Sequence, residues 1–134
     1  MNLSFYIFEA TSYQDFLKIE QEIFKSIPSY DEYVNSLKHL SESSDESQWL
    51  FNHHAAELAW ESNLKNEAKN HIQIANSLNP FENKITKVLY FIINQKGTRR
   101  DLSNWIQKNI KDSTEKETAI LLLQNDLYGK SLIS

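Results

Sequence analysis

Apolar side chains recur every three or four positions along most of the chain, which is the spacing of one face of an α-helix. Phe16, Ile19 and Ile23 follow this spacing early in the sequence, and the run KVLYFIIN at residues 87–94 follows it later. Seven helices are therefore expected, at residues 12–26, 31–41, 47–62, 65–78, 81–95, 99–111 and 114–128. Residues 1–10 are apolar enough for either a short strand or an extra helical turn.

Residues typical of helix starts and helix ends support these boundaries. A small polar residue followed three positions later by Glu or Gln is typical of a helix start, because the two side chains bond reciprocally to the exposed backbone N–H groups. Five such pairs occur: Thr11 with Gln14, Ser29 with Glu32, Asp45 with Gln48, Asn79 with Glu82, and Asp112 with Glu115. Gly97 and Gly129 follow apolar runs, as helix-ending glycines do, and Pro80 is expected at a first helical position.

The composition favours an all-α protein. The chain has 134 residues, 40% of them hydrophobic, with only two glycines and two prolines. This length suits a single domain spanning residues 1–134, and so few special turn residues leave no room for a flexible linker. The absence of cysteine excludes a disulfide framework and a thiolate metal centre.

The first residues and the net charge limit the location and the kinds of partner that are expected. The start MNLSFYIFEATSYQ has no basic leader, and Glu9 interrupts its apolar run, so we expect neither a signal peptide nor a membrane span and a cytoplasmic location. A formal charge of −4 argues against general nucleic-acid binding, which depends on many lysine and arginine contacts to phosphate. The local exception is Lys96, Arg99 and Arg100, with Trp105 nearby.

Similar positions coincide when the chain is compared with itself at a 34-residue offset. The matched pairs are Asn63 with Gly97 at the bend, Ala68 with Leu102, Ile72 with Ile106, and Ala75 with Asn109. In this pattern the chain resembles the tetratricopeptide repeat (TPR), a helix-turn-helix unit of this length. The best copy is residues 49–82, and residues 83–116 form a degenerate second copy.

The resemblance implies a short right-handed superhelix of antiparallel helix pairs. Ala56, Ala68 and Ala75 stand at the family's small positions, Ile72 at its large apolar position, and Pro80 at its closing proline. Small side chains there let two helices approach closely. One side of the first helix in each unit would then line a concave groove that receives a peptide or protein.

The expected partner-binding residues follow from this arrangement. Leu50, His53, Glu57, Trp60 and Glu61 share one side of the helix expected at 47–62, opposite Phe51, Ala55 and Ala59. The next unit would continue the groove with Lys84, Lys87 and Phe91. In the adjoining polar loop, Glu42, Asp45 and Glu46 are candidates to dock a basic partner by electrostatic attraction.

Metal binding is the sharper alternative, since His53 and Glu57 are one helical turn apart and could share an ion. A zinc site needs three or four protein ligands, and the adjacent His53 and His54 diverge by about 100° on a helix. His39 or His71 could complete a site only through tertiary contact. The chain lacks a glycine-rich phosphate loop and the metalloprotease order His-Glu-x-x-His, so we predict no catalytic residue, metal or cofactor.

These features together predict a non-enzymatic protein-binding helical module. Its small size, acidity and lack of cysteine are similar to those of bacterial immunity-type inhibitors, which neutralise a toxin, and a basic toxin domain would be a fitting partner. The alternatives are a secretion chaperone or adaptor that binds an extended peptide, and a metal-dependent enzyme that uses His53 and Glu57. A short repeat stack with open ends also predicts a homodimer.

Overall fold

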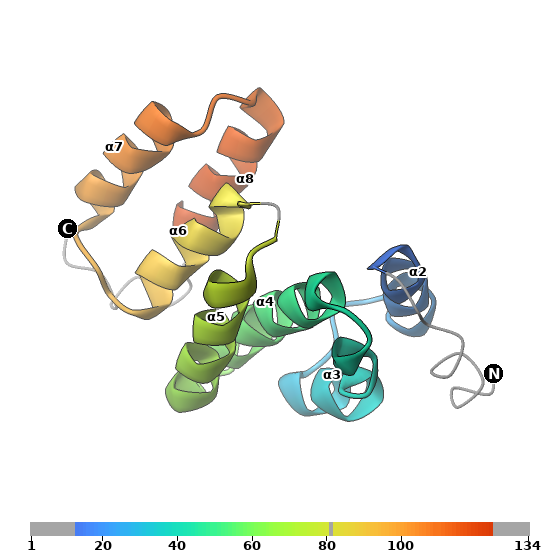
Figure 1. Cartoon of the computed structure of the whole chain (residues 1–134). Coiled ribbons are helices and arrows are strands. Elements are labelled where there is room, and N and C mark those ends of the chain that lie inside the picture. Colours follow the sequence, from blue (N-terminus) through green and yellow to red (C-terminus); the bar gives the residue numbers. More distant parts are fainter. Residues whose placement is uncertain (1–12, 81, 125–134) are drawn as a thin grey trace.

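The computed structural model describes residues 13–80 and 82–124, and within them it contains α-helices, one short 3-10 helix and no strand (Figure 1). The elements are α2 (Tyr13–Ile23), α3 (Tyr30–Leu37), η1 (Leu40–Glu42), α4 (Asp45–Glu61), α5 (Lys65–Leu78), α6 (Lys84–Ile93), α7 (Arg99–Asn109) and α8 (Ser113–Gln124). The predicted all-α class and the seven predicted helices are confirmed. The expectation for residues 1–10, the start signal at Thr11 and the stop signal at Gly129 lie outside the described residues.

The start signals were partly right. The Ser29 side chain accepts from the backbone N–H of Glu32, and that of Asp112 accepts from Glu115 N at 2.8 Å, as expected. For α4, the capping side chain is Ser44 rather than Asp45. For α6, it is Asn83, which places Pro80 in the preceding turn, so the prediction that Pro80 occupies a first helical position was wrong.

Two bends, at sequence positions 34 residues apart, have left-handed backbone. Asn63, between α4 and α5, has φ 64°, and Gly97, between α6 and α7, has φ 93°. Asparagine and glycine are the residues that tolerate this conformation best, since most side chains clash with the following carbonyl. Both predicted bends are confirmed.

Helix α4 lies at the centre of the molecule and packs against α2, α3, η1, α5 and α6. Its buried residues therefore occur on nearly all sides: Ser47, Trp49, Leu50, Phe51, Asn52, His53, Ala55, Ala56, Ala59 and Trp60. Such burial on many sides distinguishes a core helix from a surface helix with one apolar stripe. The prediction that α4 keeps one open side was wrong.

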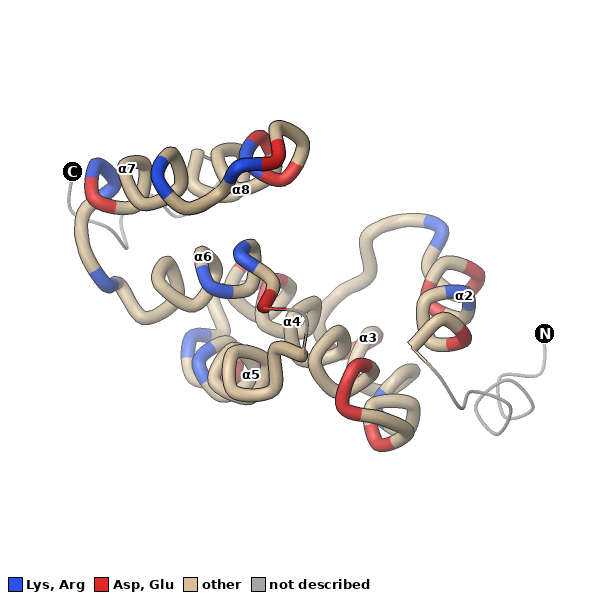
Figure 2. The backbone as a smooth tube through the Cα atoms, turned by 45° about the horizontal axis from the view of Figure 1, so that its top comes forward, with Lys and Arg blue, Asp and Glu red and all other residues tan. Residues whose placement is uncertain are grey.

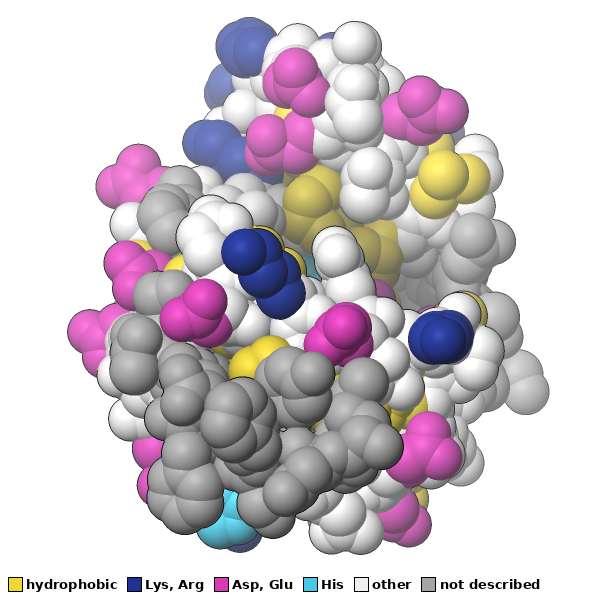
Figure 3. All heavy atoms as spheres, turned by 90° about the vertical axis from the view of Figure 1, so that its right-hand side faces the viewer, with side chains coloured by type: hydrophobic (Ala, Val, Ile, Leu, Met, Phe, Trp, Pro, Cys, Tyr) yellow, Lys and Arg dark blue, Asp and Glu magenta, His cyan; other side chains and the backbone are white. Residues whose placement is uncertain are grey.

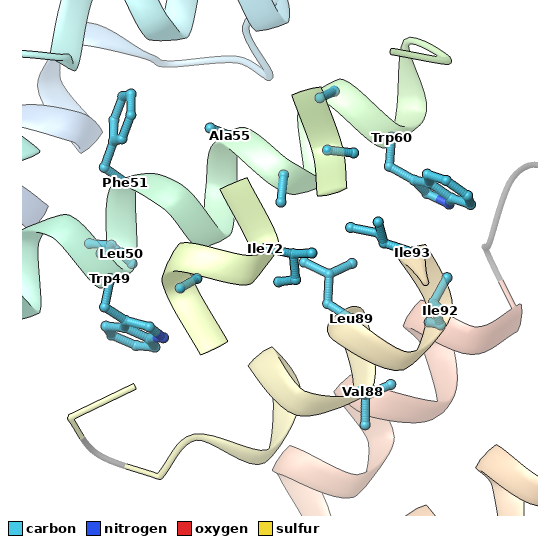
Figure 4. Packing of buried hydrophobic residues seen from close by; sticks show 14 of the residues in the cluster. Trp49, Leu50, Phe51, Ala55, Trp60, Ile72, Val88, Leu89, Ile92 and Ile93 are labelled. Atoms are coloured by element: carbon cyan, nitrogen blue, oxygen red, sulfur yellow. The ribbon is translucent and has the colours of Figure 1, made fainter. Parts of the chain in front are cut away.

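The alanines do lie at close helix contacts. Ala56 of α4 and Ala68 and Ala75 of α5 are completely buried, and these two helices form the most extensive contact among the described elements. Between Ala68 and Ala75 on the same face of α5, Ile72 points toward Leu89 of α6 (Figure 4). The alanine positions thus join α4 to α5, while the larger side chains connect this pair to the C-terminal helices.

The C-terminal helices differ from the expected second helix pair. Helix α8 contacts both α6 and α7 more extensively than these two contact each other. Thr98 and Asp101 form a reciprocal capping box at the start of α7, and the Arg99 side chain donates to the backbone oxygen of Leu123 at 3.1 Å. Part of the basic cluster around residue 99 therefore holds α7 against the end of α8. Within residues 13–80 and 82–124, no helix has the length and apolar character needed to cross a bilayer.

Candidate functional site

Three of the residues predicted to line an open groove are buried in the core. The side chains of Leu50, His53 and Trp60 are 5%, 6% and 5% exposed. Figure 4 shows Trp60 at the end of α4 that lies near Ile92 and Ile93 of α6. Leu50 and His53 therefore do not form an exposed partner-binding surface, and Trp60 exposes only a small part of its side chain. That part of the prediction was wrong because α4 is packed on several sides.

His53 belongs to a buried hydrogen-bond chain. Trp49 Nε1–H donates to Thr86 Oγ1 at 2.8 Å, and Thr86 Oγ1 is 2.9 Å from His53 Nδ1. With the hydroxyl hydrogen of Thr86 donated to Nδ1, His53 donates from Nε2 to Glu57 Oε1 at 2.8 Å. The chain ties α4 to α6 and occupies both ring nitrogens of His53, so its visible role is to orient Glu57.

His54 belongs to a second cluster, which joins α2, α3 and α4. Its Nδ1–H donates to Glu20 Oε2 at 2.8 Å, and the Tyr33 hydroxyl donates to the same oxygen. Burial disfavours the charged imidazole, but the hydrogen bond and charge of Glu20, with the charge of Glu57, outweigh this and raise the pKa of His54. Burial and the charge of Glu20 also raise the pKa of Tyr33 well above its usual value. The cluster therefore holds the Glu20 carboxylate between two donors, His54 and Tyr33.

This second cluster forms one wall of a recess of about 400 Å³ between the α2–α3 connection and α4. The lining residues are Glu20, Gln21, Phe24, Lys25, Ser26, Ile27, Pro28, Tyr33, His54, Glu57, Leu58 and Glu61. On the α2 side of the molecule, which faces the viewer in Figure 3, hydrophobic side chains gather in a hollow that acidic side chains border. Ile27, on the rim of the recess, is 84% exposed. An open, partly apolar recess with carboxylates is suited to binding.

A second recess, of about 190 Å³, lies on the other side of the same carboxylates. It is lined by Glu57, Trp60, Glu61, Leu89, Ile92, Leu121 and Leu122. Because Glu57 and Glu61 line both recesses, the two hollows meet at this pair. We call the two recesses together the acidic groove.

The carboxylates of the groove differ in their surroundings. Burial opposes ionisation of Glu57, but the hydrogen bond from His53, and the positive charges of His53 and His54 when these are protonated, lower its pKa overall. Burial and the charge of Glu57 raise the pKa of Glu61. Among the described residues, no lysine or arginine lies within ion-pair distance of Glu20, Glu57 or Glu61. The groove therefore holds two carboxylates one helical turn apart, of which Glu57 is paired with His53 and neither has a lysine or arginine partner among the described residues.

The other predicted partner-binding residues lie elsewhere. Glu42, Asp45 and Glu46 are at the N-terminal end of α4, about 24 Å from Glu61 at a rise of about 1.5 Å per residue. Lys84 and Lys87 line a separate polar cavity of about 500 Å³ with Trp105. Phe91 is half-buried, with its ring 5.5 Å from that of Trp105. The eleven residues expected to form one surface are thus divided among the core, the acidic groove, the start of α4 and the polar cavity.

His71 of α5 forms hydrogen bonds to both α3 and α4. His71 of α5 donates from Nδ1 to Asn52 Oδ1 at 2.8 Å and accepts from the Tyr30 hydroxyl at 2.9 Å, and burial lowers its pKa. In the part of the chain that the structure describes, no three His, Asp or Glu side chains are placed to share a metal ion. His53 and His71 serve instead as hydrogen-bonded links between helices.

Charge is distributed unevenly along the described chain, as Figure 2 shows. Residues 13–61 contain ten Asp or Glu and three Lys, whereas residues 62–124 contain six Asp or Glu and ten Lys or Arg. The acidic groove lies mainly on elements of the first range. A partner that docks there meets a negative field.

Sequence reasoning found Glu57 and Glu61 but missed Glu20, Phe24, Ile27 and His54. The dipeptide Ile27-Pro28 was the available signal, since the residue before a proline favours extended backbone, which places Ile27 in a connection between helices and not on a buried helix face. No family model, curated protein or solved structure matches this chain. The function must therefore be inferred from the site itself.

Proposed function

We propose that this chain is a non-enzymatic protein-binding helical module whose acidic groove docks a basic segment of a partner protein. The observation that carries the proposal is the meeting of two recesses at Glu57 and Glu61, which lack a lysine or arginine partner among the described residues. A cationic group would relieve the repulsion between these carboxylates. Complementary charge also speeds encounter and excludes wrong partners.

The apolar walls of the groove support a protein partner. Phe24, Ile27 and Leu58 line one recess, and Leu89 and Leu121 line the other. Exposed apolar side chains beside charged groups are typical of binding surfaces, where a few buried anchors supply most of the affinity. Ile27, on the rim, is suited to be such an anchor.

At the level of fold, we propose a short TPR-like stack in which the pair α4–α5 is the best-formed unit. The close packing at Ala56, Ala68 and Ala75 supports this, as do the left-handed bends at Asn63 and Gly97. The stronger contacts of α8 with α6 and α7 indicate that the second unit departs from the regular arrangement. A homodimer through the open ends of the stack stays a prediction.

Within this class, an immunity-type inhibitor that binds a basic toxin domain is the favoured biological role. The acidic character of residues 13–61 suits a basic partner and disfavours nucleic acid. A chaperone or adaptor for an extended peptide is the second candidate, because two recesses that share Glu57 and Glu61 can accept neighbouring residues of one segment. The geometry of His53, with both ring nitrogens hydrogen-bonded within the protein, does not favour the metal-dependent enzyme.

Co-purification with quantitative mass spectrometry tests the proposal. The tagged full chain is expressed in its native host and compared with Ile27→Asp, which alters the groove rim without touching the core. Ile74→Asp is the matched control, since Ile74 is 44% exposed and lies outside both recesses. We expect one protein at a stoichiometric level with the wild type and the control, and its loss with Ile27→Asp.

Retention of that protein by Ile27→Asp would overturn the proposed surface. The nature of the partner separates the two roles. A single folded toxin supports inhibition, whereas a segment that is unfolded before binding supports chaperoning.

A further inference from the structure

The centre of the acidic groove has a defined geometry. Glu57 and Glu61 are four residues apart on α4, so their side chains project from the same face in neighbouring turns. Like charges at this spacing repel each other and destabilise a helix. The pair therefore carries a local cost, and both residues line both recesses of the groove.

The two carboxylates suit a cation that has several hydrogen-bond donors. Glu57 Oε1 already accepts from His53, and among the described residues Glu61 forms no ion pair. Lys25 lies on the lining of the larger recess, but it is not within ion-pair distance of either carboxylate. An arginine guanidinium presents several N–H donors in a planar fork and bonds two acceptors at once, whereas a lysine ammonium acts as a point charge.

The apolar walls extend away from the pair in both directions. Phe24 and Leu58 lie toward the α2–α3 connection, and Leu89, Ile92 and Leu121 lie toward α6 and α8. A single side chain between the carboxylates would leave the recesses of about 400 Å³ and 190 Å³ unfilled. An extended segment can fill both, because its neighbouring residues reach outward from the central one.

We propose that the acidic groove binds an extended protein segment with a central arginine, whose guanidinium bridges Glu57 and Glu61, and with apolar residues on both sides. This assignment rests on the proposed function and specifies the partner's chemistry. The arginine stem packs along Leu58, and the flanking apolar side chains enter the two recesses. A lysine at the centre neutralises the pair but bridges it less well.

Peptide binding followed by NMR tests this assignment. The full chain, labelled with ¹⁵N, is titrated with a pool of nine-residue peptides that have arginine at the centre and Ala, Leu or Ser elsewhere. The matched pool has citrulline at the centre, which keeps the shape of arginine without its charge. We expect saturable shifts at Glu57–Glu61 and Leu121–Leu122 with the arginine pool, and binding roughly tenfold weaker with the citrulline pool.

Two double variants provide a second test of the arginine assignment. In Glu57→Gln/Glu61→Gln, the new amide oxygen still accepts from His53, so the fold is preserved and arginine preference is expected to vanish. Glu67→Gln/Glu117→Gln removes the same charge from exposed positions outside the groove and should leave the preference unchanged.

Equal binding of both pools, shifts confined to other helices, or no binding of either pool would overturn the arginine assignment. None of these results alters the co-purification test with Ile27→Asp, which judges the proposed function separately. The two proposals therefore fail in distinguishable ways.

Discussion

Thr86 is the residue on which the buried polar chain of the core depends. Its hydroxyl oxygen lies 2.8 Å from Trp49 Nε1 and 2.9 Å from His53 Nδ1, and Thr86 is completely buried. A buried polar group that loses its partner bears the full cost of its lost hydration. One small side chain thus satisfies two larger ones and fixes α6 against α4.

Thr86→Val should lower the free energy of unfolding by about 2 kcal/mol, because valine keeps the shape but leaves Trp49 and His53 without this partner. Urea unfolding monitored by circular dichroism measures the change. Thr118→Val is the matched control, since Thr118 is exposed and should change stability little. Equal stability of Thr86→Val and the wild type would show that the chain contributes nothing.

His54 predicts a pH dependence of stability. Its pKa in the folded protein is raised above the usual 6.5, so protonated His54 stabilises the fold. That contribution is fully present below the unfolded pKa and is lost as pH rises through the folded value. In the wild type, the contribution of His54 to the free energy of unfolding should therefore decrease as the pH is raised from below 6.5 to above the folded pKa.

The same pH series on His54→Gln should show a smaller loss, because glutamine does not titrate. His39→Gln removes an exposed histidine and serves as the control. Identical pH profiles for wild type and His54→Gln would contradict the assigned ion pair with Glu20.

The burial of single residues could be predicted from the sequence where one physical factor determined it. The burial of Ala56, Ala68 and Ala75 followed from their small size at helix spacing. The burial of His53 and Trp60 could not be predicted from the helical wheel, because a wheel assumes one buried side and α4 has neighbours on several sides. The clusters of His54 with Glu20 and of His53 with Thr86 join distant parts of the chain, so no local pattern contained them.

At the scale of elements, the bends at Asn63 and Gly97 set the directions of the helices that follow. Gly97 has φ 93°, and a Cβ placed there would be 3.3 Å from Asp101 Cβ. Asp101 is also the partner of Thr98 in the capping box that starts α7. A side chain at position 97 would therefore strain both the bend and the cap.

Gly97→Ala is expected to lower the free energy of unfolding by about 1 to 2 kcal/mol, since alanine disfavours left-handed backbone. Gly97→Asn should cost less, because asparagine tolerates this conformation better. Thermal unfolding of the two variants measures the difference. An alanine variant as stable as the asparagine variant would contradict the role of backbone conformation.

The helices themselves were predictable to different degrees. Helix α5 has the predicted bounds, Lys65–Leu78, because its apolar spacing is regular. The start of α6 was misplaced because Asn79, Pro80 and Asn83 all suit a helix start, and the structure uses Asn83. The order of packing among α6, α7 and α8 depends on contacts between elements, which local spacing does not encode.

At the scale of the whole molecule, the uneven charge places the acidic groove in a negative field. Residues 13–61 have a large excess of carboxylates, and residues 62–124 have an excess of lysine and arginine. Attraction between exposed charges is screened by salt over a Debye length of about 10 Å at 0.1 M ionic strength. The association rate of a basic partner should therefore respond to salt.

For the protein that co-purifies with the chain, raising ionic strength from about 0.05 M to about 0.5 M should slow association several-fold. Surface plasmon resonance measures the rate. Glu57→Gln/Glu61→Gln should weaken the salt dependence more than Glu67→Gln/Glu117→Gln. An association rate independent of salt would argue against electrostatic docking.

Site-specific photo-crosslinking in the native host tests the central claim, docking of a protein in the acidic groove, most directly. A photoreactive residue at Leu121 lies in the smaller recess, and one at Lys108 lies on an exposed part of α7 outside it. We expect position 121 to crosslink to a segment of one protein that includes an arginine, and Glu57→Gln/Glu61→Gln to abolish this product. The same product from position 108, or its persistence in the double variant, would contradict it.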